Sequence, residues 1–82
     1  MERDLLEIPG VGKAMKKDLL LLGYRCVEDL KGCDPQEMYF RLCEMTHLKQ
    51  DLCVLYVFRL VKYYAENREY DQEKLKWWNW KD

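Results

Sequence analysis

The segment Ile8-Pro9-Gly10-Val11-Gly12-Lys13 has the residue types and spacing of a turn that could hold a phosphate group. Gly10 and Gly12 permit a tight reversal of the chain, and they let the backbone come close to an anion. A helix that begins at Lys13 directs unpaired main-chain N–H groups and the positive end of its dipole toward the same point. Lys13 adds a full positive charge there. The chemistry expected of this turn is electrostatic binding of a nucleic-acid backbone.

The candidate binding residues are Pro9, the main-chain amides of Gly10, Val11 and Gly12, and the side chains of Lys13, Lys16 and Lys17. Contacts of this kind position a protein on DNA without reading its bases. One turn and about three lysines predict weak binding, with a salt slope of about −2 to −3. The formal net charge of −1 is a caution, since proteins dedicated to nucleic acid usually carry a basic excess.

Catalytic and cofactor chemistry has little support in this sequence. The only histidine, His47, follows Thr46 in an expected loop and is interpreted as a surface or capping residue. Acidic pairs such as Glu28-Asp29 are interpreted as a solvated helix start. No spacing suggests a catalytic triad, and no P-loop or dinucleotide-binding fingerprint is present. The sequence therefore predicts neither an enzyme nor a bound cofactor.

The chain has four cysteines, none of them in the C-x2-C spacing typical of zinc sites: Cys26, Cys33, Cys43 and Cys53. Residues 1–7 are too acidic for a signal peptide, and the longest apolar run, residues 52–58, is far below the ~20 residues of a membrane span. We therefore expect a cytoplasmic protein whose thiols stay reduced and are buried as small apolar side chains, with metal or redox use as the alternative.

The 82 residues suffice for a single domain, and the apolar periodicity predicts an all-α fold. A short helix is expected over about residues 2–7, ended by Pro9-Gly10, with three apolar side chains directed to the interior: Leu5, Leu6 and Ile8. A second helix is expected over about residues 13–22, ended by Gly23, with a buried stripe of Met15, Leu19 and Leu22.

A second helical pair is expected over residues 27–45, and its first member, residues 27–30, is ended by Lys31-Gly32. The next segment has the pattern of a helix start, because Asp34 can cap, Pro35 fits the first helical position and Glu37 completes a capping box. That helix should reach about Glu44 and bury Met38, Leu42, and Tyr39 or Cys43.

A long helix is expected over about residues 48–67, because the apolar pattern of residues 52–58 continues through Tyr64 without glycine or proline. Since residues 52–58 are apolar on every side of a helix, both flanks must be covered. The two short helical pairs can cover only one flank. The tryptophan-rich tail, residues 68–82, is therefore expected to fold back and cover the other.

A shift of 22 residues superposes the two helical pairs. Gly10 then falls on Gly32, whereas Gly12 falls on Asp34 and Lys13 on Pro35. A carboxylate would stand where an anion binds, and proline removes one donor N–H. The first pair, residues 2–22, is therefore interpreted as an intact phosphate-binding turn and the second as a degenerate, structural copy.

Leu6-x-Ile8-Pro9-Gly10-Val11-Gly12, followed by a helix, resembles the helix-hairpin-helix motif of DNA repair and recombination proteins, and residues 2–45 resemble its tandem form. Residues 51–59 and 75–82 resemble a small bacterial family labelled pathogenicity locus, to which the label mitomycin resistance is also attached. The resemblance implies a bacterial protein with a helix-hairpin-helix core and a loose link to DNA damage. One residue departs from the motif: Lys16 stands four positions after Gly12, where a small residue is usual.

Two functions remain open: a non-sequence-specific DNA-binding module that uses the first turn, and a protein-interaction module in which both turns are scaffold. The near-neutral charge and the tail tryptophans Trp77, Trp78 and Trp80 favour the second, although these side chains also suit a seal over the long helix. A further aromatic cluster suits either a core, which helical spacing favours, or a base-stacking platform: Tyr56, Phe58, Tyr63, Tyr64 and Tyr70. The oligomeric state stays open.

Overall fold

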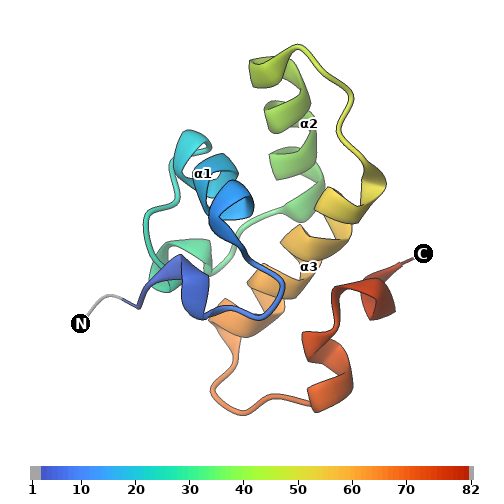
Figure 1. The fold of residues 1–82 in the computed structure, drawn as a ribbon. Coiled ribbons are helices and arrows are strands. Elements are labelled where there is room, and N and C mark those ends of the chain that lie inside the picture. Colours follow the sequence, from blue (N-terminus) through green and yellow to red (C-terminus); the bar gives the residue numbers. More distant parts are fainter. Residues whose placement is uncertain (1–2, 82) are drawn as a thin grey trace.

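The computed structural model describes residues 3–81, and all regular structure within them is helical (Figure 1). Three α-helices are present in this part of the chain: α1 (Lys13–Leu21), α2 (Pro35–Thr46) and α3 (Leu52–Glu66). Four short 3₁₀ helices accompany them: η1 (Leu5–Glu7), η2 (Val27–Leu30), η3 (Gln72–Leu75) and η4 (Trp77–Trp80). The all-α prediction is thus confirmed for the described residues. None of their helices is long and apolar enough to cross a membrane.

The helix predicted over residues 2–7 is only the 3₁₀ turn η1, which follows the capping side chain of Asp4; residue 2 lies outside the described part. A 3₁₀ helix has three residues per turn, so Leu5 and Ile8 lie on one face. Both are buried, with 0% and 1% of their surface exposed. Leu6 lies off that face and is 43% exposed, so the prediction that it is buried is wrong.

α2 begins where the sequence predicts, because the Asp34 carboxylate accepts hydrogen bonds from the N–H groups of Gln36 and Glu37. It continues to Thr46, two residues beyond the predicted end. His47 then ends the helix in the left-handed region, with a φ of +56°. Its position matches the interpretation of His47 as an exposed capping residue.

α3 begins at Leu52, four residues later than predicted, because Asp51 caps it by accepting a hydrogen bond from the Cys53 N–H. Phe58, Leu60 and Val61 are completely buried although they lie on different sides of the helix. Their burial requires cover on both flanks. α2 and η2 pack against one part of α3, and η4 packs against another (Figure 1).

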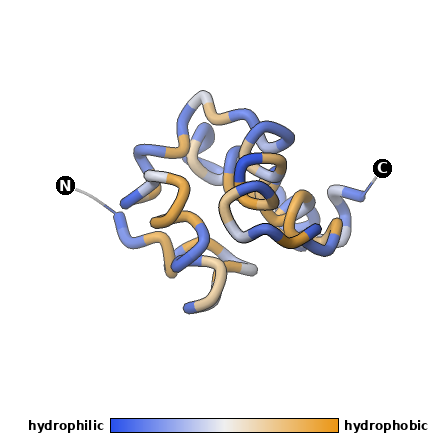
Figure 2. The backbone as a smooth tube through the Cα atoms, turned by 90° about the horizontal axis from the view of Figure 1, so that it is seen from above, coloured by the Kyte–Doolittle hydropathy of each residue, from blue (hydrophilic) through white to orange (hydrophobic). Residues whose placement is uncertain are grey.

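The hydrophobic core lies where η1, η2, α1 and α2 meet α3, and its largest fully buried side chains come from all five elements: Leu5, Leu19, Leu30, Leu42 and Phe58. Hydrophobic and hydrophilic residues alternate along the helices in Figure 2, as expected for helices with one buried face. The tail, in red in Figure 1, lies on the same side of α3 as the turn between η1 and α1. This arrangement decides what surrounds the candidate site.

Candidate nucleic-acid interface

The first turn (residues 8–12) connects η1 to α1 and reverses the chain at Gly10. Gly10 has a φ of +88°, in the left-handed region that glycine adopts without a steric penalty. The Val11 N–H donates to the Ile8 carbonyl oxygen at 3.1 Å and closes the turn, while the Val11 side chain is buried in the core. The Val11 amide, predicted as an anion ligand, is therefore already engaged within the chain.

Several main-chain N–H groups at the start of α1 have no partner. Gly12 is the N-cap residue, and without a side chain it cannot cap the helix. At the start of α1, five N–H groups have no hydrogen-bond acceptor within residues 3–81: those of Gly10, Gly12, Lys13, Ala14 and Met15. Since Gly10, Gly12, Lys13 and Ala14 are exposed, the first turn presents donors to solvent at the positive end of the α1 dipole.

The three candidate lysines on α1 have different surroundings. The Lys16 ammonium nitrogen lies 3.1 Å and 3.3 Å from the two carboxylate oxygens of Asp4. Hydrogen bonds from the Leu6 N–H and from Lys16 hold the pKa of Asp4 below its usual value. Lys16, which stands where the motif has a small residue, therefore extends its side chain to Asp4 and connects α1 to the start of η1.

Lys13 and Lys17 are exposed and form no ion pair with any residue in the described part of the chain. Both lie in the first turn and a half of α1, close to the open N–H groups. Pro9 has no N–H and is half-buried beside the turn. Of the predicted residues, the structure thus brings together the amides of Gly10 and Gly12 with the charges of Lys13 and Lys17.

The second turn (residues 30–34) repeats the backbone of the first. Gly32 has a φ of +74°, and the Cys33 N–H donates to the Leu30 carbonyl oxygen at 3.2 Å, as Val11 does to Ile8. The N–H of Met38 donates to the Asp34 carbonyl oxygen at 2.9 Å, and the equivalent bond from Lys16 to Gly12 has the same length. The 22-residue shift therefore relates hydrogen bonds as well as residue types.

Carboxylates occupy the donors of the second turn. The Gly32 N–H donates to Glu66 Oε2 on α3 at 2.7 Å. Asp34 Oδ1 accepts from the N–H groups of Gln36 and Glu37, at 3.0 Å and 3.3 Å. Asp34 and Glu66 therefore stand where an external anion would bind, and the residue equivalent to Lys13 is Pro35, which has no N–H.

The tail lies against the first turn at Gly10. A methyl group added at Gly10 would lie 3.4 Å from Leu60 Cδ2 on α3 and 3.9 Å from Trp77 Cδ1 on η4. Trp77 is half-buried and packs against the hydrophobic core. The tail thus supports the inner side of the turn, while Gly10 itself stays exposed.

The model of the family described as Pathogenicity locus matches residues 2–82, which is nearly the whole chain. The chain belongs to the Pathogenicity locus family. No curated protein and no solved structure matches it. The family description names a locus and no ligand or reaction.

Two cysteines of this Pathogenicity locus protein, Cys26 and Cys33, are buried, while Cys43 and Cys53 are half-buried; all four are free thiols. Burial raises the pKa of the Cys33 thiol to about 11, which keeps it protonated and unreactive. No group of three or more potential ligand side chains within residues 3–81 has the geometry to hold a metal ion. Cys26 and Cys33 therefore contribute apolar volume to the fold, and the half-buried Cys43 accepts a hydrogen bond from the Gln50 N–H at 3.4 Å.

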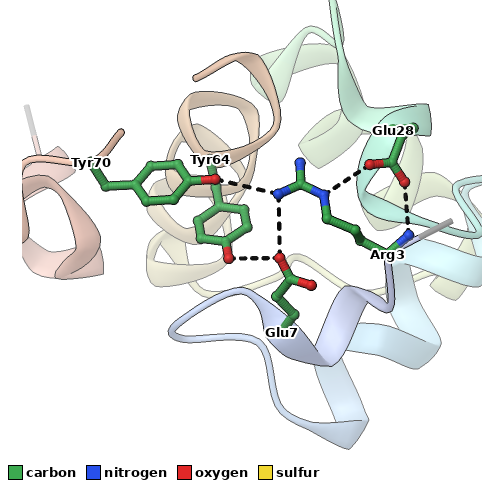
Figure 3. A network of polar contacts seen from close by, with 5 residues as sticks. All are labelled: Arg3, Glu7, Glu28, Tyr64 and Tyr70. Atoms are coloured by element: carbon green, nitrogen blue, oxygen red, sulfur yellow. Dashed lines mark hydrogen bonds and ion pairs between the residues drawn. The ribbon is translucent and has the colours of Figure 1, made fainter. Parts of the chain in front are cut away.

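Arg3 forms a polar network that joins η1, η2 and α3, and the sequence analysis did not predict it (Figure 3). Its N–H and Nε donate to the Glu28 carboxylate at 2.8 Å and 2.9 Å and lower the Glu28 pKa to about 2. Arg3 Nη1 lies 3.3 Å from Glu7 Oε2, which also accepts from the Tyr64 hydroxyl at 2.8 Å. The Tyr70 ring stacks on the Tyr64 ring, with the two centroids 4.4 Å apart. Glu28 is therefore a structural residue, and no local pattern marks it.

The aromatic cluster on α3 divides between core and edge. Phe58 is completely buried, and Tyr64 is 8% exposed with its hydroxyl hydrogen-bonded. Tyr56 and Tyr63 are half-buried. Tyr63 contacts Tyr70 and Trp80, with ring centroids 6.2 Å and 5.6 Å apart. These rings pack on one another and on the core, so they leave no open stacking platform on α3.

Proposed function

We propose that this protein is a non-sequence-specific DNA-binding module that holds the phosphate backbone at its first turn. In this proposal the two hairpins, residues 5–21 and 27–46, form a tandem helix-hairpin-helix unit in which only the first binds DNA. The observation that carries the proposal is the contrast at equivalent donors. Asp34 and Glu66 occupy the donors of the second turn, whereas the donors of the first turn are open.

The proposed contacts are main-chain N–H groups assisted by two lysines. The amides of Gly10, Gly12 and Lys13 would donate to phosphate oxygens, as helix N-termini do to anions. Lys13 and Lys17 would each neutralise about one phosphate charge, which gives a salt slope of about −2. Lys16 would contribute less than the sequence suggests, because Asp4 already neutralises it.

A link to DNA damage or repair belongs to the same proposal. It is supported by the resemblance of residues 6–12 to the motif of DNA repair proteins. Phosphate contacts alone would let the protein hold DNA of any sequence. The proposed role is binding without catalysis.

The test introduces into the first turn the capping aspartate that the second turn has. Gly12 has an extended backbone, and a Cβ there would meet no atom within 4 Å, so substitution leaves the fold intact. Gly12→Asp places a carboxylate at the position of Asp34. It should cap α1 and weaken DNA binding by about tenfold or more through occupied amides and charge repulsion.

Binding is measured by fluorescence anisotropy on duplex and branched DNA over a salt series, with folding checked by circular dichroism. Gly12→Asn is the matched control, because it can cap α1 without adding charge. It should bind more weakly than the wild type and more tightly than Gly12→Asp. Equal affinities of the wild type and a folded Gly12→Asp would overturn the proposal.

A second candidate function, interaction with protein, is favoured by exposed apolar side chains on the α1 and α2 surface. Leu20, Leu21 and Met45 are 45%, 49% and 44% exposed, and the two leucines line a groove of about 610 Å³ between α1 and Thr46. The occupant we propose is a second copy of the chain. Across a twofold axis, antiparallel α2 helices would place Arg41 opposite Glu44 and Phe40 opposite Met45.

Sedimentation velocity over a range of protein concentrations tests this second function. A dimer that Met45→Lys dissociates is the expected result. A wild-type protein that stays monomeric at the highest concentrations would exclude it.

A further inference from the structure

The three tail tryptophans have different environments. The Trp80 Nε1 donates to the Lys74 carbonyl oxygen at 2.8 Å, and its ring packs on Tyr63. Trp77 packs on the core beside Gly10. Trp78 is 50% exposed, and within residues 3–81 its indole N–H has no hydrogen-bond partner. Two tryptophans therefore have structural roles, and Trp78 has none that its contacts explain.

The residues around Trp78 are held in place by aromatic packing and hydrogen bonds. Its ring meets that of Trp77 edge to face, with centroids 5.7 Å apart and planes at 86°. Asn79 Nδ2 donates to the Glu73 carbonyl oxygen at 2.7 Å, and Arg59 Nη1 donates to that of Trp80 at 2.7 Å. These bonds tie the two residues that follow Trp78 to Glu73 and to α3. Its exposure is therefore a property of the folded tail.

Trp77 connects Trp78 to the first turn. Its Cδ1 atom would lie 3.9 Å from a methyl group added at Gly10, and its ring meets that of Trp78 edge to face. Figure 1 shows the tail and the first turn on the same side of α3. A strand held at the open amides would thus pass near the exposed indole.

The charge of this segment suits a polyanion. Residues 74–81 contain three lysines and no acidic residue, although the protein as a whole has a net charge of −1. The Lys81 ammonium lies 5.9 Å from the centroid of the Trp77 ring. Lys76 is paired with Glu73 at 3.1 Å, so Lys74 and Lys81 supply most of the available charge. Lys74 lies over the Tyr63 ring and Lys81 over the Trp77 ring, so the tail adds positive charge to that of Lys13 and Lys17 on α1.

We propose that Trp78 stacks on an unpaired base of the DNA strand whose phosphate the first turn holds. This inference rests on the proposed function and narrows its ligand to DNA with a single-stranded segment, such as a gap or a fork. Base stacking on an aromatic side chain strengthens binding by about tenfold per base and tolerates any sequence. A continuous duplex keeps its bases stacked inside the helix and offers Trp78 no such partner.

The test uses the full-length protein with three DNA ligands: a single-stranded oligothymidine, a blunt duplex of the same length, and that duplex with a central gap. Binding is followed by fluorescence anisotropy and by quenching of tryptophan emission. The wild type should bind the gapped and single-stranded DNA about tenfold more tightly than the blunt duplex, with quenching on binding. Trp78→Ala should lose that preference and much of the quenching while still binding the duplex.

The matched control is Leu52→Ala, which removes a large apolar side chain of similar exposure, 51%, from the start of α3. It should behave as the wild type on all three ligands. Trp78→Ala binding that equals the wild type on every ligand would overturn this inference and leave the proposed function intact. A wild type that binds none of the three would overturn both. Self-association that Trp78→Ala abolishes would assign Trp78 to a protein contact instead.

Discussion

The first hairpin (residues 5–21) and the second hairpin (residues 27–46) share one turn conformation, with φ values of +88° at Gly10 and +74° at Gly32. They differ in what accepts hydrogen bonds from the turn. In the second, Asp34 and Glu66 accept them at 2.7–3.3 Å. In the first, the equivalent N–H groups are left to solvent. The same backbone can thus serve as a structural joint or as an open donor site.

The two turns also differ in how much their N-cap residues stabilise the helix that follows. A capping carboxylate stabilises a helix start by about 1 kcal/mol, and the second hairpin has this contribution built in. The first hairpin lacks this stabilisation, because its N-cap residue is Gly12, although a capping side chain would fit there without any clash. An exposed N–H is solvated by water, so the open turn is tolerated. Because the N-cap residue is a glycine, the N–H groups at the start of α1 stay accessible to an external anion.

The largest effect is expected from the tail, which contacts the turn of the first hairpin at Gly10. Truncation after Glu73 removes the half-buried Trp77 and Trp80 and exposes part of α3. It should cost about 3–5 kcal/mol of unfolding free energy, the range of large-to-small core changes. Urea denaturation measures the loss, and Trp78→Ala, which removes an exposed ring, should shift the midpoint far less. An unchanged midpoint after truncation would mean that the tail is not part of the fold.

The next effect compares the two glycines directly. Gly32→Ala should cost about 1 kcal/mol, because alanine is strained in the left-handed region but has open space there. Gly10→Ala should cost about 2 kcal/mol, since its methyl group would also press on Leu60 at 3.4 Å. Thermal and urea unfolding of both variants gives the difference. Equal costs would show that the tail and α3 do not confine the first turn.

A smaller pair of effects with opposite signs is expected at the two N-cap positions. Asp34→Ala should destabilise the protein by about 1 kcal/mol, because two N–H groups of α2 lose their acceptor. Gly12→Asp should stabilise it by a few tenths of a kcal/mol, about the difference between an aspartate and a glycine cap. Denaturation midpoints measure both. Destabilisation by Gly12→Asp would mean that the two turns are not equivalent.

The smallest effect concerns the contact between the hairpins. The Glu28 pKa is lowered from 4.5 to about 2 by Arg3, so the pair stabilises the folded state above pH 4.5. This contribution should be lost as the pH falls from about 4.5 through about 2. Melting temperatures over this range should fall more steeply for the wild type than for Glu28→Gln. Parallel curves would show that Arg3 and Glu28 do not couple the hairpins in solution.

Local chemistry in the sequence determined where α1 and α2 begin. α1 was predicted over about residues 13–22 and spans Lys13–Leu21, and α2 starts at the predicted Pro35. These boundaries follow from proline, glycine and a capping aspartate, whose preferences act within a few residues. The 22-residue repeat was readable for the same reason, since both turns need a left-handed glycine at one position.

The side on which each residue lies was less predictable where the helix type changed. Leu6 was expected to be buried on an α-helical pattern, but η1 is a 3₁₀ turn with a different period. The start of α3 moved from residue 48 to Leu52, because Asp51 provides a cap that hydrophobic periodicity does not register. Both errors come from reading apolar residues alone near the end of an element.

At the open first turn, the contributions of the sequence and of the tertiary structure can be separated most clearly. The sequence by itself determined the two glycine turns, the lysines on α1, and the aspartate and proline at the equivalent positions of the second copy. Only the tertiary structure decided that Glu66, 34 residues from Gly32, occupies the second turn, that Asp4 neutralises Lys16, and that Trp77 supports Gly10. A turn is set by the backbone preferences of adjacent residues, whereas these partners meet only because the buried surface of α3 brings distant segments together.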